Sequence, residues 1–359
     1  MTGTGTRRPT LSDVATSAGV SLSTASLVFS GAKPVSDATR VRVLAAAESL
    51  GYGGPDPAAA SLRRGRSGVV GVLVGDRLIN AFRDAVTVAT LDGISEVFDE
   101  LGTGLLLMPG GPASSRTTVD RVARLALDAV VFGWCGADDE PSLDQLRRRG
   151  IPLVGVEGPH APDVPLVDLE HRAGSRALAR HLHDLGHRDV AVVTLPLVAD
   201  GRDGPADAAR QASCRFHDAR ERLAGVREVM GDVRVWEAAR HHVDDGRRAA
   251  RGLLADRATA PTAVVAQSDL LAVGVVLAAT ELGLDVPGDL SVVGFDGVET
   301  PWLGGHTLTT AVQPMVEKGR IAGRMVGAML AGERPDDVVL PVEVRLGTTS
   351  GPASPPPPR

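Results

Sequence analysis

The segment from residue 10 to residue 31 constrains this chain most strongly, because it encodes two short helices joined by a tight turn. Thr10 suits an N-cap with Asp13 three positions later, as in a capping box. Gly19 suits the turn, where a positive φ or a close helix approach is needed, and Ser21 suits a second N-cap. This is the layout of a helix-turn-helix whose second helix enters the DNA major groove. The alternative is an amphipathic helical hairpin with a small core.

The spacing of apolar residues predicts which face of each helix in this segment points inward. On the second helix the inward side chains are predicted to be Ala25, Val28 and Phe29, and the outward ones Leu22, Ser23, Ser26 and Leu27. A third helix is expected from a Ser36 cap to Leu50. Its predicted packing face consists of Val41, Leu44, Ala45 and Leu50.

Length and charge indicate a small basic head on a larger acidic body. At 359 residues and 43% hydrophobic content, two or three domains are expected. Residues 1–66 hold eight basic and four acidic side chains, a net charge of +4, whereas the remainder carries −10. This asymmetry fits a phosphate-binding module attached to a domain that does not bind nucleic acid. The chain has only two cysteines, Cys135 and Cys214, and we see no signal peptide or membrane span, so a reducing cytoplasm is expected.

From residue 68 onward, apolar runs alternate with amphipathic stretches. Unbroken β-branched runs indicate strands buried on both faces, hence parallel sheets with crossover helices. The expected strands are Val69–Val74, Gly104–Met108, Ala129–Phe132, Leu153–Val156, Val190–Thr194, Ala263–Ala266 and Ser291–Phe295. The amphipathic stretches include Asp120–Leu127, Ser175–Leu185 and Leu270–Leu282. This length favours two doubly wound subdomains with a cleft between them.

Five further motifs follow the helix-turn-helix in a fixed order. They span residues 185–192, 222–227, 267–274, 289–296 and 308–313. With residues 10–31, they make the chain similar to the LacI/GalR family of bacterial transcription regulators. Val226 replaces that family's usual aromatic residue, and Ser268 stands where Asn is usual. The resemblance implies an α/β fold: a three-helix helix-turn-helix domain (1–54), a hinge helix and linker (55–67), and a periplasmic-binding-protein-like domain of two parallel α/β subdomains (68–350). A disordered tail is expected at 351–359.

The resemblance also implies which residues contact DNA. They are Thr10, Ser21, Leu22, Ser23, Thr24, Ser26, Leu27, Ser30, Ala59, Leu62 and Arg63. Leu62 would wedge into the minor groove at the dyad of a pseudopalindromic operator. Leu27 departs from the family's common Arg and offers only apolar contact, so different base reading is expected. Two alternatives stay open. The first is that Leu22 and Leu27 fold inward. The second is that the hinge is a flexible basic linker, since it has Ala60 where Arg is common and contains one extra residue.

A second set of residues matches the family's effector site. It consists of Asp76, Phe82, Glu157, Arg222, His241, Ser268, Asp296 and Gln313. Carboxylates accept hydrogen bonds from vicinal hydroxyls and a guanidinium donates in a fork, so a sugar or sugar derivative is favoured. With only 3% aromatic residues, the chain offers little stacking surface for a nucleobase. Each of the charged residues alone also fits a surface ion pair.

Other functions are weighed against this interpretation. No catalytic set, cofactor motif or metal site is expected, and His181, His183 and His187 are read as a helix terminus rather than a metal site. A two-lobed sugar-binding protein of the transport type is the main rival, and a dehydrogenase the next. The expected partners are operator DNA, a carbohydrate effector and a second copy of the chain, without a membrane. Ligand binding would melt the hinge helix or support it, so induction and co-repression both remain open.

The hinge assignment makes one testable prediction. Leu62→Ala should weaken specific operator binding, because the minor-groove wedge is lost, while binding to non-specific DNA is largely kept. A mobility-shift titration on operator and scrambled duplex measures both affinities. An equal loss on the two duplexes would refute the assignment.

Overall fold

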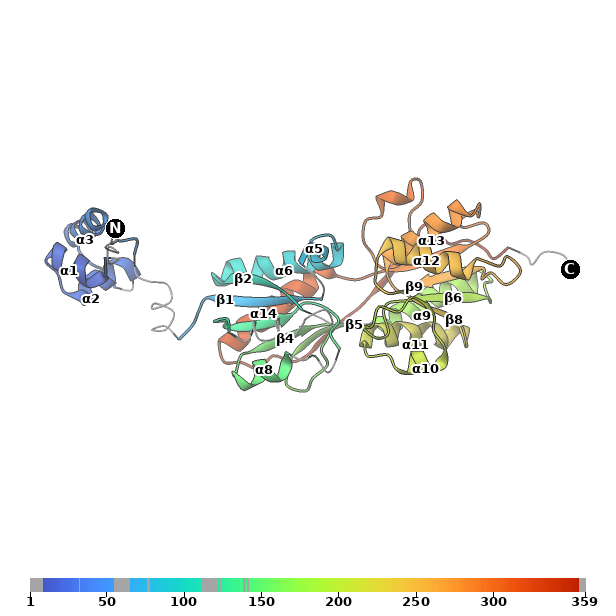
Figure 1. Ribbon diagram of the computed structural model, residues 1–359, viewed down its shortest axis with the longest axis horizontal. Coiled ribbons are helices and arrows are strands. Elements are labelled where there is room, and N and C mark those ends of the chain that lie inside the picture. The colour runs from blue at the N-terminus through green and yellow to red at the C-terminus, as the bar shows by residue number, and fades with distance from the viewer. Residues whose placement is uncertain are drawn as a thin grey trace, which may run out of the picture. The chain divides into compact units, whose positions relative to one another are not determined.

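The computed structural model describes residues 9–31, 33–54, 65–75, 78–110, 122, 124–137, 140 and 142–354. The chain divides into two compact units, Met1–Gly68 and Val69–Arg359. Figure 1 shows the helices of the first unit and the strands and helices of the second. Among the described residues, we find no helix with the length and apolar character needed to cross a membrane.

The first unit contains three helices, α1 (Leu11–Ala18), α2 (Leu22–Ser30) and α3 (Asp37–Leu50). The Thr10 hydroxyl accepts from Asp13 N while the Asp13 carboxylate accepts from Thr10 N, so the capping box forms. Gly19 ends α1 in the left-handed conformation with φ 63°. A small core is shared by all three helices and includes Val14, Ala15, Ala25, Val28 and Val43.

The predicted packing face of α3 is wrong. Val41, Leu44 and Leu50 are 66%, 47% and 38% exposed, and Ala45 is exposed as well. The buried face instead consists of Val43, Ala46 and Ala47. The two faces have the same i, i+3, i+4 spacing, so apolar periodicity alone could not separate them.

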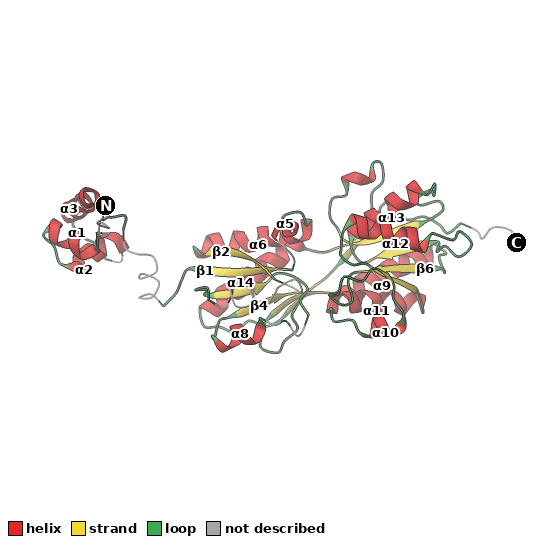
Figure 2. Ribbon diagram, in the orientation of Figure 1, coloured by secondary structure: helices red, strands yellow, loops and turns green. Residues whose placement is uncertain are grey.

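The second unit consists of two lobes, each a sheet with helices on both faces (Figure 2). The N-lobe sheet has the order β12-β5-β4-β3-β1-β2, and every pairing in it is parallel. Its strands are β1 (Val69–Val74), β2 (Gly104–Pro109), β3 (Ala129–Phe132), β4 (Leu153–Val156), β5 (Leu166–Leu169) and β12 (Val338–Leu340). Its helices are α5 (Leu78–Ala81), α6 (Ala85–Leu101), α8 (Leu143–Arg148) and α14 (Met315–Leu330).

The C-lobe sheet has the order β13-β11-β10-β9-β6-β8-β7, with antiparallel pairing only at its two edges. Its strands are β6 (Val190–Thr194), β7 (Gly204–Pro205), β8 (Arg234–Glu237), β9 (Ala263–Ala266), β10 (Ser291–Asp296), β11 (Thr309–Val312) and β13 (Glu343–Arg345). Its helices are α9 (His171–Asp184), α10 (Ala208–Ala212), α11 (His217–Met230), α12 (Val243–Leu253), α13 (Asp269–Glu281) and the 3₁₀ turn η1 (Pro301–Leu303). The predicted architecture of two parallel α/β subdomains is confirmed.

Three chain segments connect the lobes. The chain passes from β5 to α9, returns from β11 to α14, and passes again from β12 to β13. Residues beside these segments lie at the boundary between the lobes, so they are placed to sense the relative position of the two sheets.

The C-terminal segment is ordered further than predicted. Residues 351–354 were expected to belong to a disordered tail, but Gly351 O lies 3.0 Å from His187 Nε2, and Ala353 N donates to Leu185 O at 2.9 Å. His187 also contacts Thr262 and Ser291, at 2.9 and 3.1 Å. Burial of this hydrogen-bonded histidine fixes the segment; residues 355–359 lie outside the described residues.

Close helix pairs hold each lobe together. A methyl group added at Gly93 of α6 would overlap the carbonyl oxygen of Val316 in α14, and one at Gly319 would overlap that of Thr90. In the C-lobe, Gly246 of α12 and Gly274 of α13 have the same relation to each other's helix. Glycine is therefore required at these crossings for close approach of main chains.

We expect Gly93→Ala to lower the free energy of unfolding by about 3 kcal/mol, because the added methyl forces α6 and α14 apart. Urea denaturation followed by circular dichroism measures the loss. Gly305→Ala is the matched control, since its added methyl meets no atom within 4 Å. Equal stabilities of the two variants would contradict the close-packing argument.

Candidate functional site

The second helix of the head, α2, presents a row of hydroxyl groups. Ser21 caps it by accepting from Thr24 N at 3.1 Å, and its hydroxyl lies 2.8 Å from those of both Ser23 and Thr24. Ser30 is exposed at the other end of the helix, and Ser26 is half-buried. Free amide groups at a helix start and hydroxyls beside them are the groups that bind backbone phosphates.

The two leucines of α2 differ in exposure. Leu22 is 54% exposed, whereas Leu27 is half-buried. Leu22 therefore projects from the head as predicted for a base-contacting residue, and Leu27 is partly covered by it. The hinge residues Ala59, Leu62 and Arg63 lie outside the described residues, as does Asp76 of the predicted effector set.

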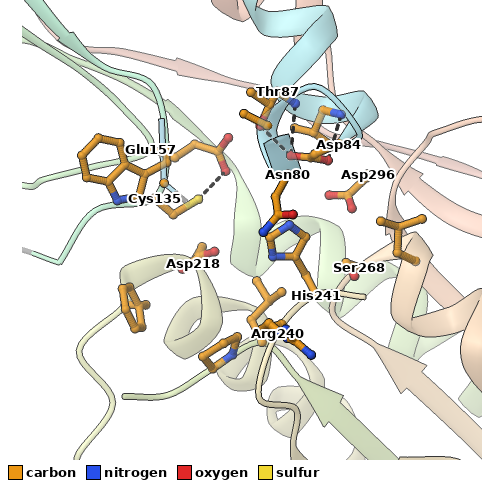
Figure 3. Close-up of a pocket in the computed structure, with 18 of the residues that line it drawn as sticks. Asn80, Asp84, Thr87, Cys135, Glu157, Asp218, Arg240, His241, Ser268 and Asp296 are labelled. Atoms are coloured by element: carbon orange, nitrogen blue, oxygen red, sulfur yellow. Dashed lines mark hydrogen bonds between the residues drawn. The ribbon is translucent and has the colours of Figure 1, made fainter. Parts of the chain in front are cut away.

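A cavity of about 490 Å³ lies between the two lobes of the second unit. The predicted residues that line it are Glu157, Arg222, His241, Ser268, Asp296 and Gln313. Figure 3 shows Asn80 and Asp84 facing His241, Ser268 and Asp296 across this cavity. Phe82 is not among the lining residues and is 61% exposed, so the structure does not bring it to the others.

The polar residues of the cavity stand at the carboxyl ends of parallel strands. Glu157 directly follows β4 with φ 59°, and Asp296 is the last residue of β10 with φ 135°. Ser268 follows β9 and caps α13, accepting from Leu271 N at 3.3 Å. Open α/β sheets bind their ligands at this edge. Both carboxylates line the cavity at the boundary between the lobes.

A chain of buried polar contacts runs through the cavity wall. Lys318, 1% exposed on α14, forms an ion pair with Glu157 and donates to Gln313 Oε1 at 2.6 Å. The amide nitrogen of Gln313 in turn donates to Asp296 Oδ1 at 2.8 Å. The N-lobe residues Glu157 and Lys318 are thereby connected to Asp296 of the C-lobe through the β11–α14 segment.

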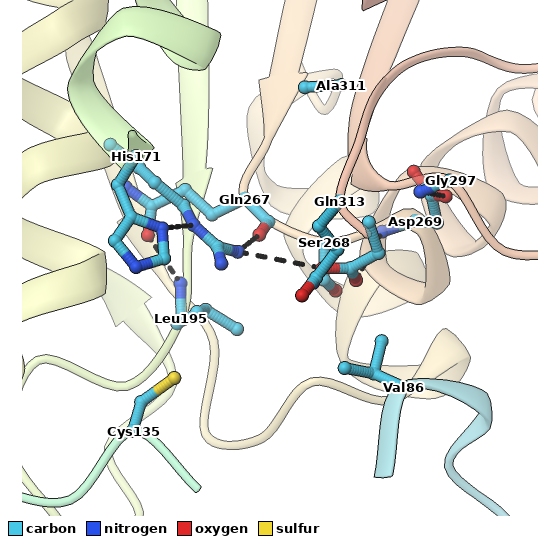
Figure 4. Close-up of polar contacts among 12 residues, drawn as sticks. Val86, Cys135, His171, Leu195, Gln267, Ser268, Asp269, Gly297, Ala311 and Gln313 are labelled. Carbon is cyan, nitrogen blue, oxygen red and sulfur yellow. Dashed lines mark hydrogen bonds and ion pairs between the residues drawn. The ribbon is translucent and has the colours of Figure 1, made fainter. Parts of the chain in front are cut away.

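Arg222 of α11 lies next to Glu157 and Asp296 of this network. Its Nη1 donates to Gln267 O at 2.5 Å, and its Nε lies 3.3 Å from His171 Nδ1, in the region drawn in Figure 4. Its guanidinium carbon stands 3.8 Å from the centre of the Phe295 ring, a cation–π contact. Its nitrogens lie 3.7 Å from Glu157 and 3.8 Å from Asp296, so a single guanidinium faces both carboxylates.

Burial and neighbouring charges shift the pKa values of these carboxyl groups in opposite directions. Burial alone would raise the pKa of Glu157, but Lys318, His171 and Arg222 together lower it to about 2. Burial raises the pKa of Asp296 well above its usual range, and Arg222 only partly opposes this. Burial also raises the pKa of Asp269 to about 6. Among the carboxyl groups that line the cavity, Glu157 is therefore firmly ionised, whereas Asp296 is easily protonated.

Sequence reasoning missed several cavity residues. They are Asn80 of α5, Asp84 and Thr87 at the start of α6, Trp134 and Cys135 after β3, Asp218 of α11, and Lys318 of α14. Two of them carry buried polar atoms, Asp218 Oδ1 and Trp134 Nε1, with no hydrogen-bond partner among the described residues. Only the rarity of lysine could have pointed to Lys318 from the sequence, because it is one of two lysines in the chain.

Comparison with known proteins decides the family. The head, residues 10–54, matches the model of bacterial regulatory proteins of the lacI family, and residues 179–350 match that of the periplasmic binding protein-like domain. An HTH-type transcriptional regulator of Mycolicibacterium smegmatis is 35% identical over 96% of this chain and 97% of its own. One of Mycobacterium tuberculosis is 36% identical, covering 98% and 99%.

The chain belongs to the LacI family. It is a DNA-binding transcriptional regulator, as the resemblance predicted. Among solved structures, this LacI-family chain is similar to a CelR–cellobiose complex (TM-score 0.67, 27% identity, 95% and 100% of the two chains). The lac repressor dimer bound to operator and an anti-inducer shares the fold, with a TM-score of 0.78, 24% identity and coverage of 96% and 100%.

The buried ion pair between Glu157 and Lys318 predicts how the stability of this LacI-family regulator depends on pH. The pKa of Glu157 is lower in the folded state than the ordinary value of 4.5, so its stabilisation is fully present above pH 4.5 and is lost as the pH falls toward 2. Glu157→Gln should therefore lower the free energy of unfolding by about 3 kcal/mol at pH 7. At pH 4 the difference in unfolding free energy between the variant and the unsubstituted protein should be smaller by about 1 kcal/mol.

Urea denaturation at the two pH values measures this difference. The exposed Glu333 provides the control, because Glu333→Gln should leave stability unchanged at both pH values. A cost for Glu157→Gln that does not depend on pH would show that the carboxylate charge is not what stabilises the junction.

Proposed function

We propose that this regulator is a homodimeric repressor, not an enzyme, that acts in the cytoplasm and binds a pseudopalindromic operator. A small polar effector, a sugar or sugar derivative, controls that binding from the cavity between the lobes. The observation that carries the effector assignment is the set of polar and charged side chains that line this cavity, among them Asp84, Asp218 and Asp296. Several hydrogen-bonding groups around a cavity of this kind suit a small ligand that carries several hydroxyl groups.

The dimensions of the cavity support a ligand of monosaccharide to disaccharide size. Its volume of about 490 Å³ lies in the range of small-molecule sites. Asp218 and Asp296 offer acceptors for hydroxyl groups, while Arg222 and His241 offer donors. The similar regulator CelR has been solved with cellobiose, a disaccharide.

The head supplies the DNA-binding half of the proposal. Leu22, 54% exposed at the start of α2, offers apolar contact to a base edge, for instance a thymine methyl. The hydroxyls of Ser21, Ser23 and Thr24 stand at the same helix end and would bond phosphates. Two copies of the chain would read two half-sites of one operator.

Effector and operator would be coupled by the position of the lobes. A ligand in the cavity touches both lobes, so it favours the arrangement that closes around it. Only a difference in effector affinity between the DNA-bound and free arrangements can change operator affinity. The transport-type alternative receives no support, because residues 10–54 belong to a regulatory head.

Selection of binding sites from random duplex DNA tests the DNA-binding half. The selected sequence should be a pseudopalindrome, and its affinity should fall steeply with salt because of the basic head. Repeating mobility shifts with a carbohydrate panel identifies the effector and whether it releases or strengthens binding. Recovery of no sequence above scrambled competitor would overturn the proposed function.

The effector assignment predicts a separable variant. Asp218→Ala should weaken effector affinity at least tenfold, since a hydrogen bond to a charged group contributes about 1.5–3 kcal/mol. Operator affinity without effector should be unchanged. Asp232→Ala, at a side chain 98% exposed, is the matched control and should leave both affinities unchanged. An unaltered effector response in Asp218→Ala would remove Asp218 from the site.

A further inference from the structure

Three metal-binding side chains meet where the two lobes join. They are His160 in the segment after β4, Asp168 on β5, and His217, the first residue of α11. One ligand atom from each lies within 4.8 Å of the others. His160 Nε2 is 3.1 Å from Asp168 Oδ2, and His217 Nε2 is 3.8 Å from the same oxygen. Two imidazoles from different lobes therefore turn their nitrogens toward one carboxylate oxygen.

The cluster is enclosed but reachable. Asp168 is buried, while the side chains of His160 and His217 are 25% and 27% exposed. The two imidazole rings lie against each other, with centroids 4.0 Å apart and an angle of 34° between planes. A site with three protein ligands and one face open to solvent is the arrangement in which zinc keeps a water molecule as fourth ligand.

Neighbouring groups orient the carboxylate for this role. Asp168 Oδ1 accepts from Leu169 N at 2.8 Å and lies 3.3 Å from His171 Nε2. With Oδ1 held in this way, Oδ2 is the oxygen presented to the two histidines. Ligating carboxylates are commonly held by such outer contacts.

Exposed Arg220, whose Nη2 lies 3.2 Å from His217 Nδ1, has to turn toward solvent when an ion occupies Nε2, because Nδ1 then carries the proton.

We propose that His160, Asp168 and His217 form a binding site for one divalent transition-metal ion of the zinc class. In a tetrahedral zinc site, bonds of about 2.1 Å place ligand atoms about 3.4 Å apart. The observed separations of 3.1 and 3.8 Å lie on either side of this value. Two imidazole nitrogens suit zinc, nickel or copper, whereas calcium and magnesium prefer oxygen ligands.

The sequence predicts no metal site, and its neighbouring histidines His181, His183 and His187 are typical of a helix terminus. The proposed ligands come from three separate segments, and only the fold brings them together. Because two ligands belong to the N-lobe and one to the C-lobe, a bound ion stabilises the arrangement of lobes in which they meet.

The metal site is also connected to the effector cavity. His171 Nε2 lies 3.3 Å from Asp168 Oδ1 and 3.3 Å from Glu157 Oε2, and Glu157 lines the cavity. Metal occupancy therefore gives this regulator a second input that acts on the same two lobes. The site itself does not depend on which effector fills the cavity.

Calorimetric titration of full-length, tag-free, chelator-treated protein with Zn²⁺ tests the proposal in the absence of DNA and sugar. One ion per chain is expected, and His160→Gln and His217→Gln should each weaken binding at least tenfold. His306→Gln, at an exposed histidine of the C-lobe, is the matched control and should bind as the unsubstituted protein does. Circular dichroism and thermal unfolding verify that each variant is folded.

Replacement of Zn²⁺ by Co²⁺ supplies an independent readout, because a tetrahedral site gives intense visible absorption that the His217→Gln variant should lose. Equal Zn²⁺ affinity in the unsubstituted protein and both ligand variants would overturn the proposal. So would a Co²⁺ spectrum unchanged by His217→Gln. Neither result bears on the proposed effector, which is measured without added metal.

Discussion

Buried charge at the junction of the lobes is the constraint on which the rest of the effector domain depends. Glu157, Lys318 and Arg222 are all buried, and each is satisfied mainly by groups from another part of the chain. Removing charged groups from water costs several kcal/mol per ion, repaid only when geometry and hydrogen bonding are complete. The segments that connect the lobes must therefore hold these groups in register, and this fixes the cavity between them.

The same arrangement explains how a regulator with few aromatic residues can hold a polar ligand. Parallel strands β4 and β10 deliver their carboxylates from opposite lobes, and α11 delivers Asp218 and Arg222 beside them. Under the proposed function, ligand binding would rest on directed hydrogen bonds rather than stacking, and the position of the ligand's hydroxyl groups would decide which ligands bind. Asp296, whose pKa burial raises, is the group most sensitive to what enters the cavity.

The sequence predicted the scaffold better than the site. All seven predicted runs are strands. Six of them are buried along nearly their whole length, as strands with both faces covered should be, whereas the leucine-rich β2 is only partly buried. Short or polar strands such as β8 were not recognised, and α3 has two equally apolar faces, so its packing face was misassigned. Six of the eight effector residues predicted by motif matching line the cavity. Asp218 and Lys318 also line it, but they lie on two helices far apart in the sequence, and residue spacing does not predict that these helices meet. Contacts between distant segments, such as His160 with His217, arise only from the three-dimensional fold.

The glycine contacts between α6 and α14, and between α12 and α13, have a mechanical consequence. Where main chain touches main chain, side chains have no freedom to absorb a displacement, so each lobe moves as a single stiff block. A shift at one wall of the cavity then becomes a rotation about the three connecting segments. Atoms at the far edge of a lobe travel in proportion to their distance from that axis, so a sub-ångström adjustment beside the effector is magnified across the lobe.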